Sequence, residues 1–140
     1  MQSLDMTEML LETYRLADQI NDSKEVKRYL ELQRLIAEDP TAQSLIQEFQ
    51  KKKDIFEDCQ RFGHFHPDYH AAKKEAQRFR RAMREHPLIG EYLDLEEWLD
   101  HLLAEVSRRI AEAVSDTVKV PIHDPRELRK ANRNRRDHCG

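Results

Sequence analysis

Glycine and proline are scarce in this sequence of 140 residues, which contains three glycines and five prolines. These residue types supply most tight turns, so their scarcity argues against a sheet-rich fold with many short connections. No apolar run approaches the roughly 18 residues that span a bilayer. Because 39% of the residues are hydrophobic and 36% are charged, we expect a mostly helical protein whose apolar residues lie along helix faces.

Cysteine is also rare, with only Cys59 and Cys139 present. Two cysteines so far apart do not imply a disulfide framework. The N-terminal sequence MQSLDMTEML lacks the basic region and apolar stretch of a signal peptide. We therefore expect a soluble, cytoplasmic protein without membrane insertion, in which both cysteines are thiols or metal ligands.

Hydrophobic periodicity predicts an all-α fold of about five helices, over residues 7–20, 23–39, 40–62, 69–86 and 88–118. Asp39 and Pro40 are typical of a helix start, and Gly63 is typical of a helix end. Pro67 suits the first turn of the next helix, so residues 63–67 should form a tight turn. The third and fourth helices should then pack side by side as a long antiparallel hairpin.

The last predicted helix has some thirty residues, or roughly 45 Å at 1.5 Å per residue. Its main apolar stripe is flanked by further apolar residues, among them Ile89, Trp98, Leu103 and Val114. One neighbouring helix would leave part of this wide band in water, so we expect an oligomer-forming bundle in which other subunits cover it. Residues 1–120 should form the helical domain, and residues 121–140 a flexible basic tail.

Charge is segregated more strongly than the net charge of -3 suggests. Residues 70–86 contain six Lys or Arg and two Glu, whereas residues 91–105 contain six acidic residues and no Lys or Arg. The two segments could pair with each other or remain solvated. Alternatively, basic side chains of the fourth helix could attract phosphates or an acidic partner, namely Lys73, Lys74, Arg78, Arg80, Arg81 and Arg84. Tyr69 and Phe79 lie on the apolar stripe and leave this basic face without stacking aromatics, which argues against sequence-specific RNA recognition.

The segment DCQRFGHFHPDYHAA, residues 58–72, gathers chemically active residue types around the predicted turn. His64, His66 and His70, with Asp68 or Cys59, could in principle hold zinc. No CxxC or HExxH motif accompanies them, so solvated polar residues at a helix corner are the better interpretation. We also find no glycine-rich phosphate loop, nucleophile elbow or defined nucleophile and base pair, so no catalytic residue is predicted.

Two motifs carry a family resemblance. The first is an aromatic-E-D-x-Q-R-F-G-x-aromatic-H-P-D-Y pattern from Phe56 to Tyr69, and the second is A-V-S-x-x-V-K-V-P from Ala113 to Pro121. In identity, order and separation they resemble the YlbF/YmcA family of control-of-competence regulators, and the YlbF branch in particular. The resemblance extends from the first helix to Pro121.

The resemblance implies a cytoplasmic, helical, oligomer-forming regulatory protein without catalytic activity or a small-molecule substrate. Proteins of this kind work with YmcA and YaaT in a complex that modulates mRNA processing by RNase Y and is needed for competence, sporulation and biofilm formation. Direct RNA binding through the basic helix and tail is one alternative function. A metal-binding or iron-sulfur redox module is another.

The resemblance also implies a cofactor. An iron-sulfur cluster would need Cys139 and ligands from partner subunits, because the tail contains one cysteine where a cysteine-rich tail is expected. Cys59 lies on an apolar stripe and is better interpreted as a core residue.

In the corner motif, Asp68 should cap the fourth helix, while Phe62 and Tyr69 should close the apolar seam of the hairpin. Arg61 and His66 have no evident packing role, and the predicted partner contacts are Arg61, His66, Asp68, Tyr69 and Lys119.

Overall fold

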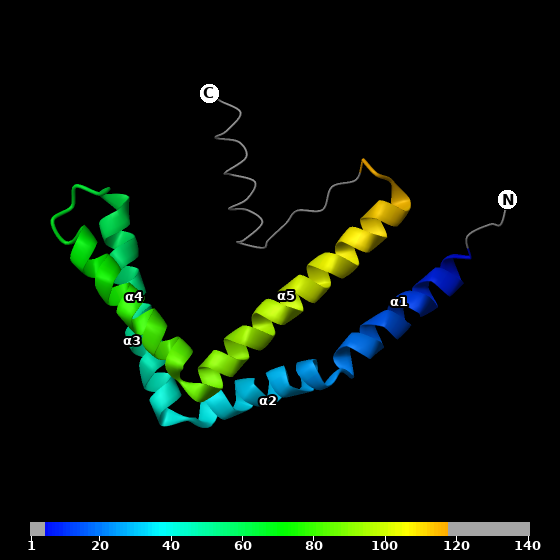
Figure 1. Ribbon diagram of the computed structural model, residues 1–140, viewed down its shortest axis with the longest axis horizontal. Helices are drawn as coiled ribbons and strands as arrows, with labels where there is room; N and C mark the ends of the chain where they lie inside the picture. The colour runs from blue at the N-terminus through cyan, green and yellow to red at the C-terminus, as the bar shows by residue number, and fades with distance from the viewer. Residues whose placement is uncertain (1–4, 118–140) are drawn as a thin grey trace. The chain divides into compact units, whose positions relative to one another are not determined.

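The computed structural model describes residues 5–117. These residues form five helices, α1 (Met6–Asn21), α2 (Lys24–Glu38), α3 (Pro40–Arg61), α4 (Tyr69–Glu85) and α5 (Pro87–Val114) (Figure 1). No strand occurs within this range, so the all-α prediction is confirmed. The predicted tail, residues 121–140, lies outside the described residues, and its division from a helical domain stays a prediction.

The chain divides into two compact units, residues 1–95 and residues 96–140. The first unit contains α1 to α4 and the start of α5. The second contains the rest of α5 among its described residues.

Side-chain caps explain where the first three helices begin. Asp5 accepts a hydrogen bond from the backbone N–H of Thr7 at 2.9 Å, and Ser23 accepts one from Val26 at 3.3 Å. Asp39 accepts from Ala42 at 2.8 Å, and Pro40 occupies the first turn of α3. Each cap satisfies an N–H group that has no partner inside the helix.

The core of the first unit lies where α2, α3 and α5 meet. Ile36, Ala42 and Ile89 form its buried centre, with Met83 of α4 among the side chains packed around it. Gly90 allows α5 to start close to the end of α4, because a Cβ atom at this position would lie 2.5 Å from the carbonyl oxygen of Arg84. The core therefore fixes the base from which the α3–α4 hairpin extends.

Helices α3 and α4 lie side by side along their length, as the antiparallel hairpin predicted (Figure 1). Near its outer end, Phe56 and Cys59 of α3 pack against Tyr69 and Ala72 of α4. Farther along, Lys52 lies 4.0 Å from Glu75. These contacts position the connection between the helices, residues 62–68, which we call the corner.

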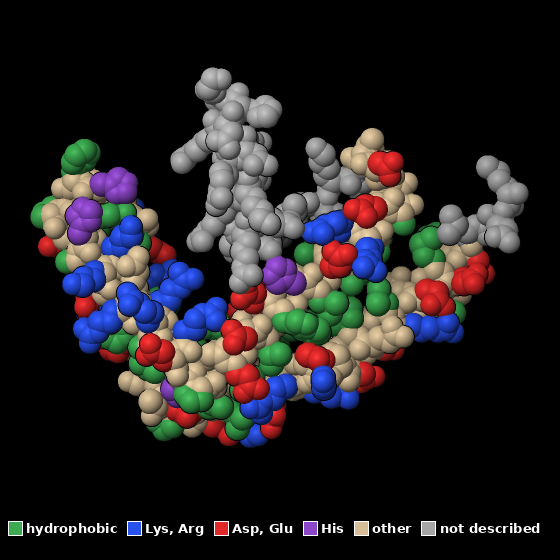
Figure 2. Space-filling model, viewed as in Figure 1, with side chains coloured by type: hydrophobic (Ala, Val, Ile, Leu, Met, Phe, Trp, Pro, Cys, Tyr) green, Lys and Arg blue, Asp and Glu red, His purple; other side chains and the backbone are tan. Residues whose placement is uncertain are grey.

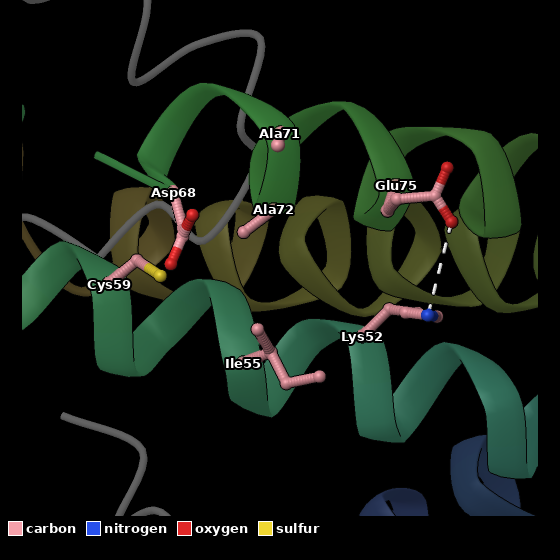
Figure 3. Close-up of a pocket in the computed structure, with 7 residues that line it drawn as sticks. All are labelled: Lys52, Ile55, Cys59, Asp68, Ala71, Ala72 and Glu75. Carbon is pink, nitrogen blue, oxygen red and sulfur yellow. Dashed lines mark ion pairs between the residues drawn. The ribbon is translucent and has the colours of Figure 1, made fainter. Parts of the chain in front are cut away.

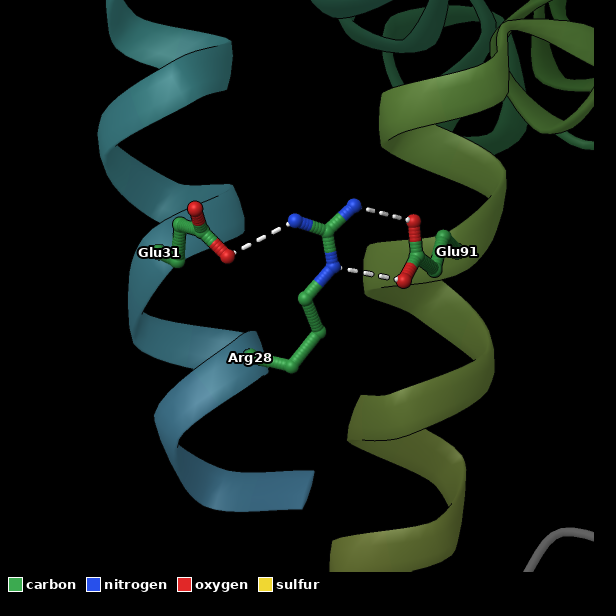
Figure 4. Close-up of polar contacts among 3 residues, drawn as sticks. All are labelled: Arg28, Glu31 and Glu91. Carbon is green, nitrogen blue, oxygen red and sulfur yellow. Dashed lines mark hydrogen bonds and ion pairs between the residues drawn. The ribbon is translucent and has the colours of Figure 1, made fainter. Parts of the chain in front are cut away.

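Polar contacts attach α2 to the start of α5. Arg28 donates hydrogen bonds of 2.7 and 2.8 Å to the two carboxylate oxygens of Glu91, and a third of 2.7 Å to Glu31 (Figure 4). At the next residue of each helix, the rings of Tyr29 and Tyr92 stack with centroids 4.7 Å apart. Their hydroxyl groups are 2.8 Å apart and share a hydrogen bond. This paired arrangement fixes the register of the two helices.

Helix α1 differs from the others because it has no buried residue. It nevertheless carries large hydrophobic side chains, all of them exposed, which we call the α1 apolar surface: Met6, Met9, Leu10, Leu11, Tyr14 and Leu16. None of the helices described within residues 5–117 has the length and hydrophobicity needed to span a bilayer.

Candidate functional site

The corner is a tight connection held by backbone hydrogen bonds. Gly63 has a φ angle of 81°, which is the left-handed conformation predicted for the residue that ends a helix. Its N–H group bonds to the carbonyl oxygen of Gln60 at 3.0 Å, and its own carbonyl accepts from His66 at 3.2 Å. The corner is therefore a turn whose backbone is held by hydrogen bonds at both Gly63 and His66.

Two aromatic residues of the motif lie differently from the prediction. Tyr69 closes the hairpin seam as predicted, but its side chain is only 5% exposed, which leaves little of it for the predicted partner contact. Phe62 does not close the seam, because it is 75% exposed. The physical reason is that Phe62 follows the last helical residue, where the chain already turns into Gly63 and no longer follows the helical stripe.

The polar residues of the corner also need correction. Asp68 sits at the N-cap of α4 but makes no side-chain capping bond, because its backbone is in a helical conformation. His66 has a packing role after all, since its Nδ1 accepts the N–H of Asp68 at 3.2 Å and its ring lies 5.8 Å from that of Phe62. Arg61 is exposed and lies 3.5 Å from Asp58. Of the predicted partner contacts at the corner, Arg61 is therefore the best placed to meet a partner protein.

A shallow groove of about 280 Å³ runs between α3 and α4 (Figure 3). Ile55, Ala71 and Ala72 make its surface apolar, and buried Cys59 also lines it. Its polar groups are Asp68 and the Lys52–Glu75 ion pair. This arrangement resembles a contact surface for apolar side chains more than a reaction centre, which needs converging polar groups.

The residues from 5 to 117 contain no cluster of three or more His, Cys, Asp or Glu side chains that could hold a metal ion. The imidazole of His64 instead packs edge-on against Tyr69, with ring centroids 4.7 Å apart. Cys59 is 6% exposed within the hairpin seam, which agrees with its interpretation as a core residue. The described residues therefore do not fit an iron-sulfur cluster. Lys119 and Cys139 lie outside the described residues.

The predicted basic side chains of α4 divide into two groups. Arg78 lies over the ring of Phe79 and 3.4 Å from Glu75, and Arg84 forms an ion pair of 2.9 Å with Asp94. In contrast, Lys73, Lys74, Arg80 and Arg81 are exposed and have no ion pair with any described residue. Pairing of the basic fourth helix with the acidic fifth is thus found at Arg84 and Asp94, while Glu91 pairs with α2 instead.

The hydrophobic periodicity of the sequence did not indicate two sets of exposed apolar side chains. Leu10, Leu11 and Tyr14 lie beside the stripe that predicts the first helix, so the width of the α1 apolar surface was not recognised. Phe65, which is 99% exposed, belongs to no stripe. Its position between Gly63 and Pro67 was the available signal, because a side chain within so short a turn has little protein to pack against.

In the second unit, the described part of α5 also exposes hydrophobic side chains, as its wide apolar band predicted. They are Trp98, Leu103, Ile110 and Val114. Several exposed large apolar side chains on one helix are typical of an interaction surface.

The family of the chain follows from its similarity to known proteins. Residues 10–115 match the family described as control of competence regulator ComK, YlbF/YmcA. The regulatory protein YlbF of Bacillus subtilis strain 168 is 32% identical over 123 residues, which are 88% of this chain and 83% of that protein.

Among solved structures, a chain in the crystal structure of Bacillus subtilis RicA in complex with RicF is similar, with a TM-score of 0.69 and 31% identity. The similarity covers 82% of this chain and all of that chain. With a family match over most of its length and a relative of this identity, the chain belongs to the YlbF/YmcA family.

Proposed function

We propose that this chain is a non-enzymatic regulatory adaptor that acts by assembling with other proteins through exposed helix faces. The α1 apolar surface is the observation that carries the proposal. None of the 16 residues of this helix is buried, so hydrophobic burial within the described residues does little to stabilise it. Isolated helices of about this length are marginal in water, so α1 gains most by packing against a partner.

The comparisons support assembly with a related chain. The similar solved chain belongs to a complex of two proteins, RicA and RicF. We infer that this protein forms a comparable complex, with a YmcA-like chain as the direct partner and a YaaT-like protein as a further component. It would also self-associate when the partner is absent.

The regulatory role follows from the relative named as a regulatory protein. We infer that the assembled complex directs RNase Y-dependent mRNA processing and through it competence, sporulation and biofilm formation. The chemistry would then be carried out by the nuclease. Arg61 and Lys119 are proposed as contacts to these larger partners.

The experiment is a pull-down of a co-expressed YmcA-like protein by the tagged full-length chain. The variant L10Q/Y14Q removes apolar surface from α1 at two exposed positions, so folding should be preserved. We expect capture to fall about ten-fold or more, since two large apolar contacts contribute roughly 1.5 to 3 kcal/mol each when fully buried.

Two controls locate the contact. F65Q changes an equally exposed hydrophobic side chain at the corner and should leave capture of the YmcA-like protein unchanged. R61A should affect recovery of an RNase Y-like protein without affecting the first partner. Undiminished capture by a folded L10Q/Y14Q variant would refute assembly through α1.

A further inference from the structure

The first observation is a set of cations on α4 that form no ion pairs within the described fold. Lys73, Lys74, Arg80 and Arg81 are exposed and form no ion pair with residues 5–117. Elsewhere in the first unit, exposed cations such as Lys27, Arg34 and Lys51 do have an acidic neighbour within 4.0 Å. Unpaired like charges repel one another along a helix, so their presence needs another explanation.

The second observation is their arrangement. At 3.6 residues per turn, the four cations fall with Arg84 on one side of α4, which we call the basic face. The packing residues Ala72 and Met83 fall on the other side of the helix, whereas Tyr69, four residues before Lys73, lies next to the basic face. Residues 73 to 84 extend roughly 16 Å along the helix axis at 1.5 Å per residue. This distance matches several successive phosphates of a nucleic acid strand.

The third observation is the pair of exposed aromatic side chains at the corner that leads into α4. Phe65 and Phe62 are 99% and 75% exposed. Figure 2 shows hydrophobic and His side chains at the outer end of the hairpin and Lys and Arg side chains along it on the same face. Aromatic rings beside a line of cations are the combination that single-strand-binding surfaces use.

We propose that the corner and the basic face together bind single-stranded nucleic acid. Phosphates lie along Lys73, Lys74, Arg80 and Arg81, and unpaired bases stack on Phe62 and Phe65. Recognition is sequence-tolerant, because every base offers a face for stacking and no base-edge contact is required. The proposal does not depend on the adaptor function, since the full chain alone carries the surface.

The same observations disfavour other ligands. A second copy of the chain could offer acidic groups to the cations, but contacts of this kind would not explain the exposed rings of Phe62 and Phe65. An acidic protein would use the cations but would leave Phe62 and Phe65 without a role. A duplex keeps its bases stacked internally, so it cannot use the exposed rings.

The test measures fluorescence anisotropy of labelled oligouridine with the full-length chain. In K73Q/K74Q/R80Q/R81Q we expect at least ten-fold weaker binding, and a salt dependence of the binding constant lower by roughly three in log–log slope. The matched control K24Q/K27Q/R34Q/K51Q removes the same charge from cations that have acidic neighbours. It should bind nearly as the unmodified chain does.

A second comparison tests stacking. F62A/F65A should bind roughly five-fold more weakly or worse, whereas Y14A, which removes an exposed ring from α1, should have no effect. Oligodeoxythymidine and a duplex of equal length are measured in parallel. Binding of either single strand in preference to the duplex supports the proposal, and the two arms identify RNA or DNA as the ligand.

Three outcomes would overturn it: unchanged affinity in the fourfold α4 variant, equal affinity for the duplex, or full competition by polyglutamate at matched charge. The last would assign the face to an acidic protein. Measuring a chain that lacks residues 126–140 shows how much of the nucleic-acid binding this basic segment contributes. If its removal alone abolishes binding while the α4 variant binds normally, the proposal also fails.

Discussion

At the residue scale, two aspartates in equivalent positions have different roles. Asp39 caps α3 through a 2.8 Å hydrogen bond to Ala42, whereas Asp68 makes no such bond at α4. We expect D39A to lower the free energy of unfolding by about 1 kcal/mol, as loss of a helix cap typically does. D68A should change it by much less. Urea unfolding of both variants tests this, and equal losses would contradict the difference in capping.

The Arg28–Glu91 ion pair should make the stability of the folded state depend on pH. Hydrogen bonds from Arg28 hold the pKa of Glu91 below its ordinary value of 4.5. Because the folded pKa is the lower one, the stabilisation is present above about pH 4.5 and is lost as pH falls through the folded pKa. In R28Q the pKa of Glu91 should rise toward 4.5, as followed by carboxyl NMR titration. R34Q, which removes a different ion pair, should leave it unchanged.

At the element scale, the aromatic residues near the corner differ in whether they stabilise the α3–α4 hairpin. Y69A should cost about 3 kcal/mol or more, because it empties a buried aromatic site between α3 and α4. F65A should leave the free energy of unfolding within about 0.5 kcal/mol of the original, since Phe65 contacts mainly solvent. Thermal unfolding of the two variants makes the comparison, and a strongly destabilised F65A would show that the ring packs.

The helices themselves were largely predictable, whereas the details of the corner were not. Pro40, Pro87 and the caps Ser23 and Asp39 mark helix starts locally, so the sequence signals coincide with the structure. Phe62 was misplaced because periodicity was carried one residue beyond the helix end. The Arg28–Glu91 contact joins residues 63 apart in sequence, and no local pattern indicates such a pair. Lys73, Lys74, Arg80 and Arg81 form no ion pair within residues 5–117, and this likewise depends on their neighbours in space.

At the scale of the whole molecule, the exposed apolar surfaces predict association. A lone chain has a mass of 16.7 kDa, and we expect sedimentation at micromolar concentration to show a larger species. L10Q/Y14Q should shift the distribution toward the monomer, because the α1 apolar surface is reduced. A monomeric, well-behaved original chain under the same conditions would argue against self-association.

The absence of buried side chains in α1 has a consequence for the lifetime of the protein. Because no side chain of α1 is buried, the helix opens at little free-energy cost, and its amides should exchange with deuterium far faster than those of α3. Proteases cleave such openings first. A partner that covers α1 would slow both processes, so an unassembled copy would be trimmed from this end while an assembled one is spared. The amount of intact protein would then follow the supply of its partner.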